Sequence, residues 1–274
     1  MSNKHGGRNI HSYHVHSTFS DGKNTPEEIV LAAIEKGFVS IGFSDHGFTG
    51  YDLRYCMKDQ TGYINEIKRL KEAYRSQIQI YLGIEEDAFD PVHRNDFDYV
   101  IGSCHYIQKD GAYYPIDSGP DYFKKCLAVF GDDPLVFADA YYCSFCQYIT
   151  FRKPDIVGHF DLITKYDEIG GSLFLENEKY HKISVKYMEE AINSGCIFEV
   201  NTGAIARGLR TTVYPFENLL HVLKKNNAPI ILSSDSHSID ILDFSFLETK
   251  KYLKDLGFRK LTVLCNNSFR NCDL

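Results

Sequence analysis

The chain of 274 residues is long enough for one large α/β barrel or two small domains. Hydrophobic residues make up 43% of it and charged residues 24%, which is the composition of an ordinary globular protein. A net charge of -7 argues against general nucleic-acid binding, and no apolar run approaches the roughly 20 residues of a membrane helix, so we expect neither a nucleic-acid nor a membrane partner.

The first ten residues contain no apolar stretch, so we expect no secretory signal. We interpret residues 1–10 as a flexible lead and residues 11–274 as a single domain, because no linker-like segment divides the chain. Eight scattered cysteines without a secretory signal are typical of a cytoplasmic protein with free thiols.

The first predicted strand contains "SYHVHSTFSDG", residues 12–22. Alternate side chains of a strand face the same side, so His14 and His16 would point together. Two neutral imidazoles side by side suit a divalent cation, whereas the alternative is a surface strand with two solvated histidines.

Strands and helices then alternate along the chain. Thr25, Pro26 and Glu28 predict the start of a helix that ends at Gly37. Further helices are predicted over residues 62–77, 121–150 with a break near residues 131–134, 180–195 and 216–227. Strands are predicted over residues 39–46, 78–87, 97–105, 154–161, 196–203 and 229–237, with a last short strand at residues 260–264.

Apolar strands joined by helices indicate a parallel sheet covered on both faces. About seven such strands precede residues 260–264, and no G-x-G-x-x-G motif supports a dinucleotide-binding fold. We therefore predict an α/β protein whose sheet closes as one TIM-like barrel rather than staying open.

Metal-capable side chains stand at or just beyond the ends of these strands. In a parallel barrel all those ends lie on the face that carries active sites. The set comprises six histidines and three carboxylates: His14, His16, Asp21, His46, Glu85, His105, His159, Asp235 and His237. One ion cannot hold so many ligands, so the set predicts two or three ions of Zn, Mn or Fe. Such a centre favours metal-assisted hydrolysis, of phosphate esters ahead of amides.

Seven motifs, taken together, resemble those of the PHP (polymerase and histidinol phosphatase) family, in its histidinol-phosphate phosphatase branch of the HisK/HisJ type. They are "HVHSTFSDG", "SDHG", "GIEED", "GSCHY", "GHFD", "NTGA" followed by Arg207, and "SSDSH". They run in the family order from about Tyr13 to His237. The resemblance implies a distorted (β/α)7 barrel with three divalent metal ions.

The resemblance also implies roles for particular residues. The first ion would bind His14, His16, Glu85 and Asp235; the second Glu85, His105 and His159; the third Asp21, His46 and His237. Arg207 would grip the phosphate, with Lys165 and His46 as further substrate contacts. Asp161, two residues after His159, could protonate the leaving alkoxide or orient a ligand. Residues Gly50 to Tyr63 could form a lid over the amino-imidazole end of the substrate, and Asp45 would support the site rather than bind metal.

The implied activity is hydrolysis of L-histidinol phosphate to L-histidinol and phosphate in histidine biosynthesis. Two alternatives stay open at this stage. One is a phosphoesterase that acts on a nucleotide or another small phosphate ester, and the other is a sensor module that keeps the fold without catalysis. The sequence does not indicate an oligomeric state.

Overall fold

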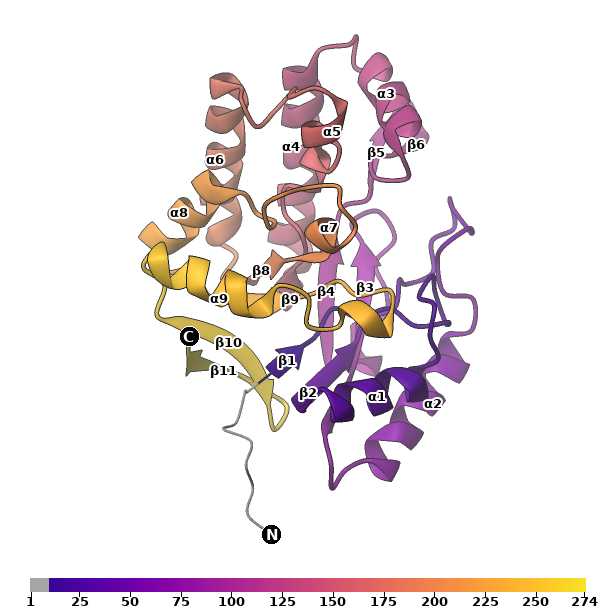
Figure 1. The fold of residues 1–274 in the computed structure, drawn as a ribbon. Coiled ribbons are helices and arrows are strands. Elements are labelled where there is room, and N and C mark those ends of the chain that lie inside the picture. The colour runs from indigo at the N-terminus through magenta and orange to yellow at the C-terminus, as the bar shows by residue number, and fades with distance from the viewer. Residues whose placement is uncertain (1–9) are drawn as a thin grey trace.

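The computed structural model describes residues 10–274 (Figure 1). The lead predicted for residues 1–10 lies outside the described residues, apart from Ile10, with which the first strand begins. A parallel sheet of seven strands forms the centre of the fold, as predicted. In sheet order the strands are β1 (Ile10–Ser12), β2 (Phe38–Phe43), β3 (Gln79–Asp87), β4 (Tyr99–Ser103), β7 (Ile156–Val157), β8 (Ile197–Asn201) and β9 (Ile230–Ser233).

The first and last strands meet just beyond their carboxyl ends. Val15 pairs with Ser236 as an isolated parallel bridge. The amide of His16 donates to the carbonyl of Ser236 at 2.8 Å, and the amide of Ser236 donates to the carbonyl of His14 at 3.2 Å. The sheet is therefore a nearly closed barrel, which confirms the predicted fold class, and its seam runs between β1 and β9.

Helices cover the outside of the sheet (Figure 1). Thr25 and Glu28 form the predicted capping box at the start of the first helix, and Asp133 caps the helix that follows the predicted break. The longer helices are α1 (Pro26–Glu35), α2 (Gln60–Ala73), α3 (Pro120–Val129), α4 (Pro134–Arg152), α6 (Glu178–Ile192), α8 (Glu217–Lys225) and α9 (Phe246–Asp255). The short ones are α5 (Asp167–Gly170), α7 (Gly203–Ala206), η1 (Arg94–Asp96), η2 (Leu162–Thr164) and η3 (Ile239–Ile241). None of the helices within residues 10–274 has both the length and the apolar character to cross a membrane.

Two antiparallel hairpins and α9 are absent from the prediction. The first hairpin pairs β5 (Tyr106–Lys109) with β6 (Ala112–Pro115), and the second pairs β10 (Lys260–Cys265) with β11 (Ser268–Asp273). Their two-residue turns are Asp110-Gly111 and Asn266-Asn267, all four residues at positive φ. This is the turn chemistry of a tight hairpin, so the signal was present in the sequence.

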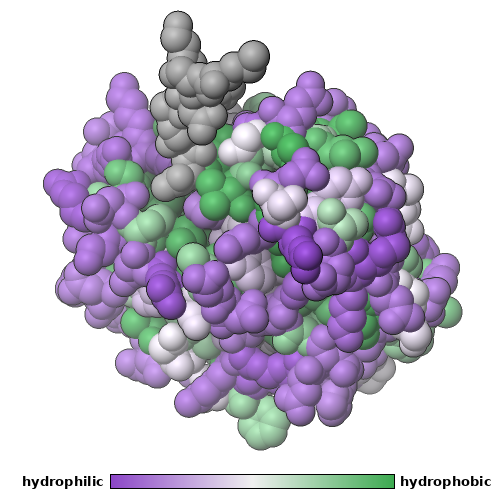
Figure 2. All heavy atoms as spheres, turned by 90° about the horizontal axis from the view of Figure 1, so that it is seen from below, coloured by the Kyte–Doolittle hydropathy of each residue, from purple (hydrophilic) through white to green (hydrophobic). Residues whose placement is uncertain are grey.

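Aromatic and aliphatic side chains fill the amino end of the barrel. The hydroxyl of Tyr99 donates to the carbonyls of Tyr13, at 2.5 Å, and Phe43, at 3.1 Å. The hydroxyl of Tyr13 donates to the carbonyl of Leu264 at 3.0 Å, which ties the β10–β11 hairpin to the sheet. Seen from this end, the surface is largely hydrophilic with scattered hydrophobic residues (Figure 2). The polar strand ends lie at the opposite end of the barrel.

The close approach of Gly83 to the Tyr99 ring gives a test of this packing. A Cβ atom at Gly83 would lie 2.2 Å from Cζ of Tyr99, which is much closer than a van der Waals contact. The buried Tyr99 ring would have to move, at a cost in stability. We expect Gly83→Ala to lower the free energy of unfolding by about 1–3 kcal/mol, measured by chemical denaturation. Gly170→Ala is the matched control, because its nearest atom, Cβ of Tyr166, would lie at 3.9 Å. Equal stability of the two variants would contradict this account of the barrel interior.

Candidate metal centre

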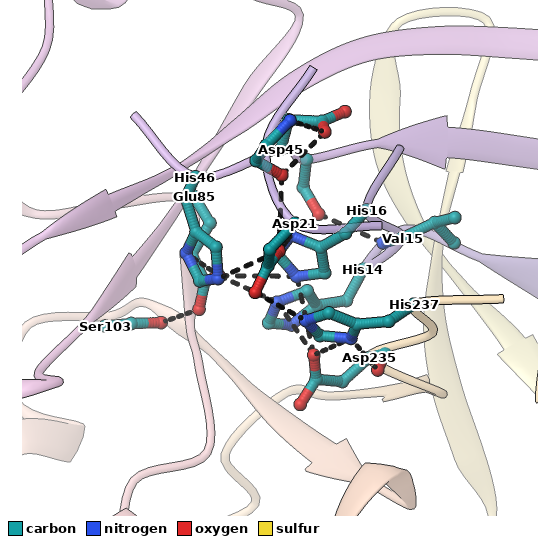
Figure 3. Close-up of polar contacts among 12 residues, drawn as sticks. His14, Val15, His16, Asp21, Asp45, His46, Glu85, Ser103, Asp235 and His237 are labelled. Atoms are coloured by element: carbon teal, nitrogen blue, oxygen red, sulfur yellow. Dashed lines mark hydrogen bonds and ion pairs between the residues drawn. The ribbon is translucent and has the colours of Figure 1, made fainter. Parts of the chain in front are cut away.

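Nine side chains converge at the carboxyl ends of the strands. Figure 3 labels all of them except His105 and His159. The nine side chains form four overlapping groups of three or four residues, and within each group one potential ligand atom per residue lies within 4.8 Å of the others. The nine residues are His14, His16, Asp21, His46, Glu85, His105, His159, Asp235 and His237. This is the set predicted from the sequence, so the structure brings every one of those side chains together. The partition into groups differs from the predicted one, since His14 groups with Glu85 and His159 as well as with His16 and Asp235.

Glu85, near the end of β3, lies at the centre of the set and is 1% exposed. Its Oε2 atom lies 2.9 Å from Nδ1 of His46 and 3.2 Å from Nε2 of His14. Its Oε1 atom lies 3.0 Å from Nε2 of His159 and 3.4 Å from Nε2 of His105. One carboxylate thus faces imidazoles that follow four different strands, which is the arrangement of a bridging ligand.

Asp21 defines the outer side of the centre. Its Oδ1 atom lies 3.7 Å from Nε2 of His46 and 3.8 Å from Nδ1 of His16, and its Oδ2 atom lies 3.4 Å from Nε2 of His237. Burial opposes ionisation of this carboxyl, but His46 and His237 hold its pKa below the usual range. The side chain is 34% exposed, so this group of ligands faces the solvent.

The polar atoms at the centre are better placed to bind a cation than to form hydrogen bonds with one another. Nε2 of His14, both ring nitrogens of His16 and Oε2 of Glu85 are buried and make no well-formed hydrogen bond among the described residues. Burial lowers the pKa of His16 to about 3, so its imidazole is neutral near pH 7 and its lone pair is available. Ligand atoms held about 2.1 Å from one ion stand roughly 3–3.5 Å apart, which is the spacing found here. Mixed imidazole and carboxylate donors suit Zn, Mn or Fe.

Glu199 supports the centre and was not predicted as a site residue. Its Oε1 atom lies 2.6 Å from Nδ1 of His14, which leaves Nε2 of that ring for the centre. Its Oε2 atom accepts from the amide of His159 and from Nδ2 of Asn201, both at 2.9 Å. An acidic residue inside the apolar strand β8 was the available sequence signal, because a buried carboxylate needs such partners.

Asp45 holds the loop that carries Asp21. Its Oδ1 atom accepts from the amides of Ser17, at 2.8 Å, and Ser20, at 3.0 Å, and from the Ser20 hydroxyl at 2.7 Å. The carboxylate therefore fixes the turn after His16 instead of joining the metal-capable groups. This is the supporting placement expected from the sequence.

Arg207 and Asp235 form an ion pair beside the centre. Nη2 of Arg207 donates to Oδ2 of Asp235 at 2.9 Å, and Nη1 donates to the Asp235 carbonyl at 3.1 Å. The backbone of Asp235 has a φ of 48°, in the left-handed region, which these contacts help to hold. A Cβ atom at Gly203 would lie 2.9 Å from both partners of the pair, so this position requires glycine.

A cavity of about 390 Å³ opens over the centre. Arg54 and Tyr55, from the segment predicted as a lid, line its wall. Residues 51–59 are irregular and α2 begins at Gln60, so the last residues of the predicted lid are helical. The remaining wall residues outside the nine are Tyr106, Asp117, Ser118, Leu162, Lys165 and Arg207.

Asp161 does not line this cavity, although His159 does. The expectation that the two residues share a face assumed an extended chain, but the chain turns after β7, with the Leu162 amide donating to the His159 carbonyl at 2.9 Å. The fully buried Asp161 carboxylate instead accepts from the Phe216 amide at 3.0 Å and lies 3.5 Å from Nη1 of Arg210. A direct proton transfer from Asp161 to a leaving group in the cavity is therefore not supported.

Comparison with known proteins agrees with the motifs. The family profile described as "PHP domain" matches residues 12–203. A protein of Schizosaccharomyces pombe named "Probable histidinol-phosphatase" is 27% identical over 259 residues, which cover 87% of this chain and 83% of that protein. The "Histidinol-phosphatase" of Bacillus subtilis is 25% identical over 258 residues, which cover 85% of this chain and 95% of that protein.

A solved structure supports the fold. The crystal structure of histidinol phosphate phosphatase from Lactococcus lactis, complexed with Zn, L-histidinol and phosphate, superposes with a TM-score of 0.73 at 20% identity. The superposition covers 95% of this chain and 98% of the other. Since the profile also covers more than half of this chain, from the end of β1 to the start of α7, the chain belongs to the PHP domain family.

Proposed function

We propose that this protein is a metal-dependent phosphomonoesterase that hydrolyses L-histidinol phosphate to L-histidinol and phosphate, in histidine biosynthesis. The observation that carries the proposal is the convergence of nine metal-capable side chains beneath a cavity whose walls bear Lys165 and Arg207. Relatives named histidinol-phosphatase, aligned over most of both chains, support the choice of substrate. Free cysteines and a biosynthetic role fit a cytoplasmic location.

We assign the nine side chains to three divalent ions. In this proposal Glu85 would be shared by an ion on the His14 side and an ion held by His105 and His159, and the solvent-facing group around Asp21 would hold the third. Bound ions would supply an activated water as the nucleophile and positive charge against the phosphate oxygens. We further propose that residues 11–274 act as one domain, because one hydrophobic cluster includes residues from Ile10 to Leu261.

Protein cations complete the phosphate site in this proposal. The planar guanidinium of Arg207 can donate to two phosphate oxygens at once. Its ion pair with Asp235 holds the guanidinium at the edge of the centre. Lys165 contributes a second positive charge from the cavity wall, and His46 borders the same space. Asp161 acts as a positioning residue, since it holds Arg210 and the Phe216 amide behind the wall.

The proposed reaction is tested by phosphate release from a panel of monoesters. We expect L-histidinol phosphate to be hydrolysed with the highest kcat/KM, and we expect exhaustive chelation to abolish turnover and Zn or Mn to restore it. A preference for a 3′-phosphorylated nucleotide, with no activity on L-histidinol phosphate, would favour a different phosphoesterase. Fewer than two transition-metal ions per chain, together with no activity after metal addition, would favour the sensor alternative.

The Arg207→Ala variant tests whether Arg207 binds the phosphate group of the substrate. Loss of a charged donor aimed at the developing phosphate charge should lower kcat/KM by about 100-fold. Metal content should stay at the wild-type value, because the residue is not among the nine. Elemental analysis and steady-state kinetics measure both quantities, with the exposed Arg75→Ala as the control. Unchanged kinetics would remove Arg207 from the substrate site.

Glu199→Gln tests the support of His14. The amide keeps the size of the side chain but removes the charge that holds the His14 ring, so we expect metal affinity to fall by about 10–100-fold. Metal retained during dialysis against graded chelator gives the affinity. Glu189→Gln, on the exposed face of α6, is the matched control. Retention equal to that of the control would show that Glu199 has no part in metal binding.

A further inference from the structure

Asp117 is a cavity-lining carboxylate that the metal centre does not use. Among the described residues that line the cavity, the carboxylates are Asp21, Asp117 and Asp235, and only Asp117 falls outside the metal-capable groups. It lies between the end of β6 and the start of α3, a segment to which no role has been assigned so far.

Residues after β7 hold this segment in place. Nζ of Lys165 donates to the carbonyl of Asp117 at 3.1 Å and lies 3.1 Å from its Oδ2 atom. The hydroxyl of Tyr166 donates to the same carbonyl. The Asp117 side chain is 22% exposed, and its Oδ1 atom has no hydrogen-bond partner within residues 10–274. The backbone carbonyl and Oδ2 of Asp117 are therefore held in place, while its Oδ1 atom is available to a ligand.

Asp117 also lies within electrostatic reach of the metal centre. Burial opposes its ionisation, but Lys165, His105 and His159 lower its pKa below the usual value. The carboxylate is thus negatively charged near pH 7, on a wall whose other charged side chains outside the nine, Arg54, Lys165 and Arg207, are cations.

The chemistry of the proposed substrate matches this division of charge. In L-histidinol phosphate the ammonium sits on the carbon next to the one that carries the phosphate ester. When the phosphate lies between the metal centre and Arg207, the ammonium must stay close to the centre, where the wall cations repel it. Tyr55 and Tyr106 line the same cavity, with nearly parallel rings whose centroids lie 6.2 Å apart. Together they form an aromatic surface suited to an imidazole.

We propose that Asp117 binds the ammonium group of a vicinal amino-alcohol phosphate through Oδ1 and thereby determines the specificity of the enzyme. This inference rests on the proposed phosphatase function. It predicts that the enzyme discriminates between L-histidinol phosphate and the matched ester that lacks the amine, 3-(imidazol-4-yl)propyl phosphate.

The test compares kcat/KM for these two esters in the metal-loaded wild-type protein, Asp117→Asn and the control Asp121→Asn. We expect the wild type to prefer the amine-bearing ester, and we expect Asp117→Asn to reduce that preference at least tenfold. Asp121→Asn, which removes an exposed carboxylate of α3 outside the cavity, should leave both kcat/KM values and the preference unchanged.

Each other outcome has a defined meaning. An unaltered preference in Asp117→Asn, or an equal fall in Asp121→Asn, would overturn the assignment, since the preference would then not depend on the carboxylate in the cavity. A wild type that turns over both esters equally would overturn it too, while leaving the proposed phosphatase intact. A wild type that hydrolyses other monoesters but neither imidazole ester would instead refute the proposed substrate. If Asp117→Asn turns over neither ester, calorimetric titration with L-histidinol and with its amine-free analogue gives the preference from binding alone, and an unchanged ratio overturns the inference.

Discussion

The buried carboxylate of Glu85 is the constraint on which the site and much of the fold depend. Five imidazoles, those of His14, His16, His46, His105 and His159, lie within 3.5 Å of its oxygens, and the group is 1% exposed. Transfer of a carboxylate from water into a protein interior costs several kcal/mol unless positive charge compensates it. Burial opposes protonation of His14, His46 and His105, but the neighbouring carboxylates raise the pKa of each imidazole above its usual value, so these rings can supply such charge. Divalent ions shared between the imidazoles would supply it with the rings in their neutral form. The centre of the site is therefore a buried carboxylate whose charge its surroundings must compensate.

The side chains around Glu85 and its neighbouring imidazoles are themselves paired with polar or charged groups farther from the centre. Ser103 donates to Oε1 of Glu85 at 2.5 Å, Glu199 faces the far side of the His14 ring, and Arg207 balances Asp235. The contacts of Ser103 and Glu199 each occupy one side of a side chain whose other polar atom faces the centre. Charge compensation extends into the cavity, where Oδ2 of Asp117 pairs with Lys165 and Oδ1 is left for a ligand. A phosphate and an ammonium carried on adjacent carbons would each meet opposite charge there.

The convergence of the nine side chains could be predicted from the sequence because it depends on a simple geometric rule. Parallel strands place their carboxyl ends at one edge, so polar residues after apolar strands meet there even when they are far apart in sequence. His14 and His237 illustrate this, since more than two hundred residues separate them. The fold class followed from the same alternation of apolar strands and helices.

The rule fails where the chain leaves the strand direction. Asp161 follows a turn that an alternating pattern does not reveal, so its side chain lies against Arg210 rather than in the cavity. Asp117 could not be predicted for a related reason. Its position depends on the β5–β6 hairpin and on contacts from Lys165 and Tyr166, which come from a distant part of the chain. Specificity residues on connecting segments generally have this property, because tertiary contacts rather than local patterns orient them.

The location of the centre also bears on how the barrel closes. β1 has three residues and β9 has four, and beyond them the seam is held by the bridge between Val15 and Ser236. His14 and His16 lie on one side of that seam, and Asp235 and His237 lie on the other, with Nε2 of His16 only 3.4 Å from Oδ1 of Asp235. An ion bound by these residues would join the first strand to the last, where few ladder hydrogen bonds do so. Because such binding is possible only in the folded chain, its free energy adds to the stability of the closed barrel. Short strands are then sufficient at the seam, because metal binding by the residues that follow them would complete the closure of the barrel.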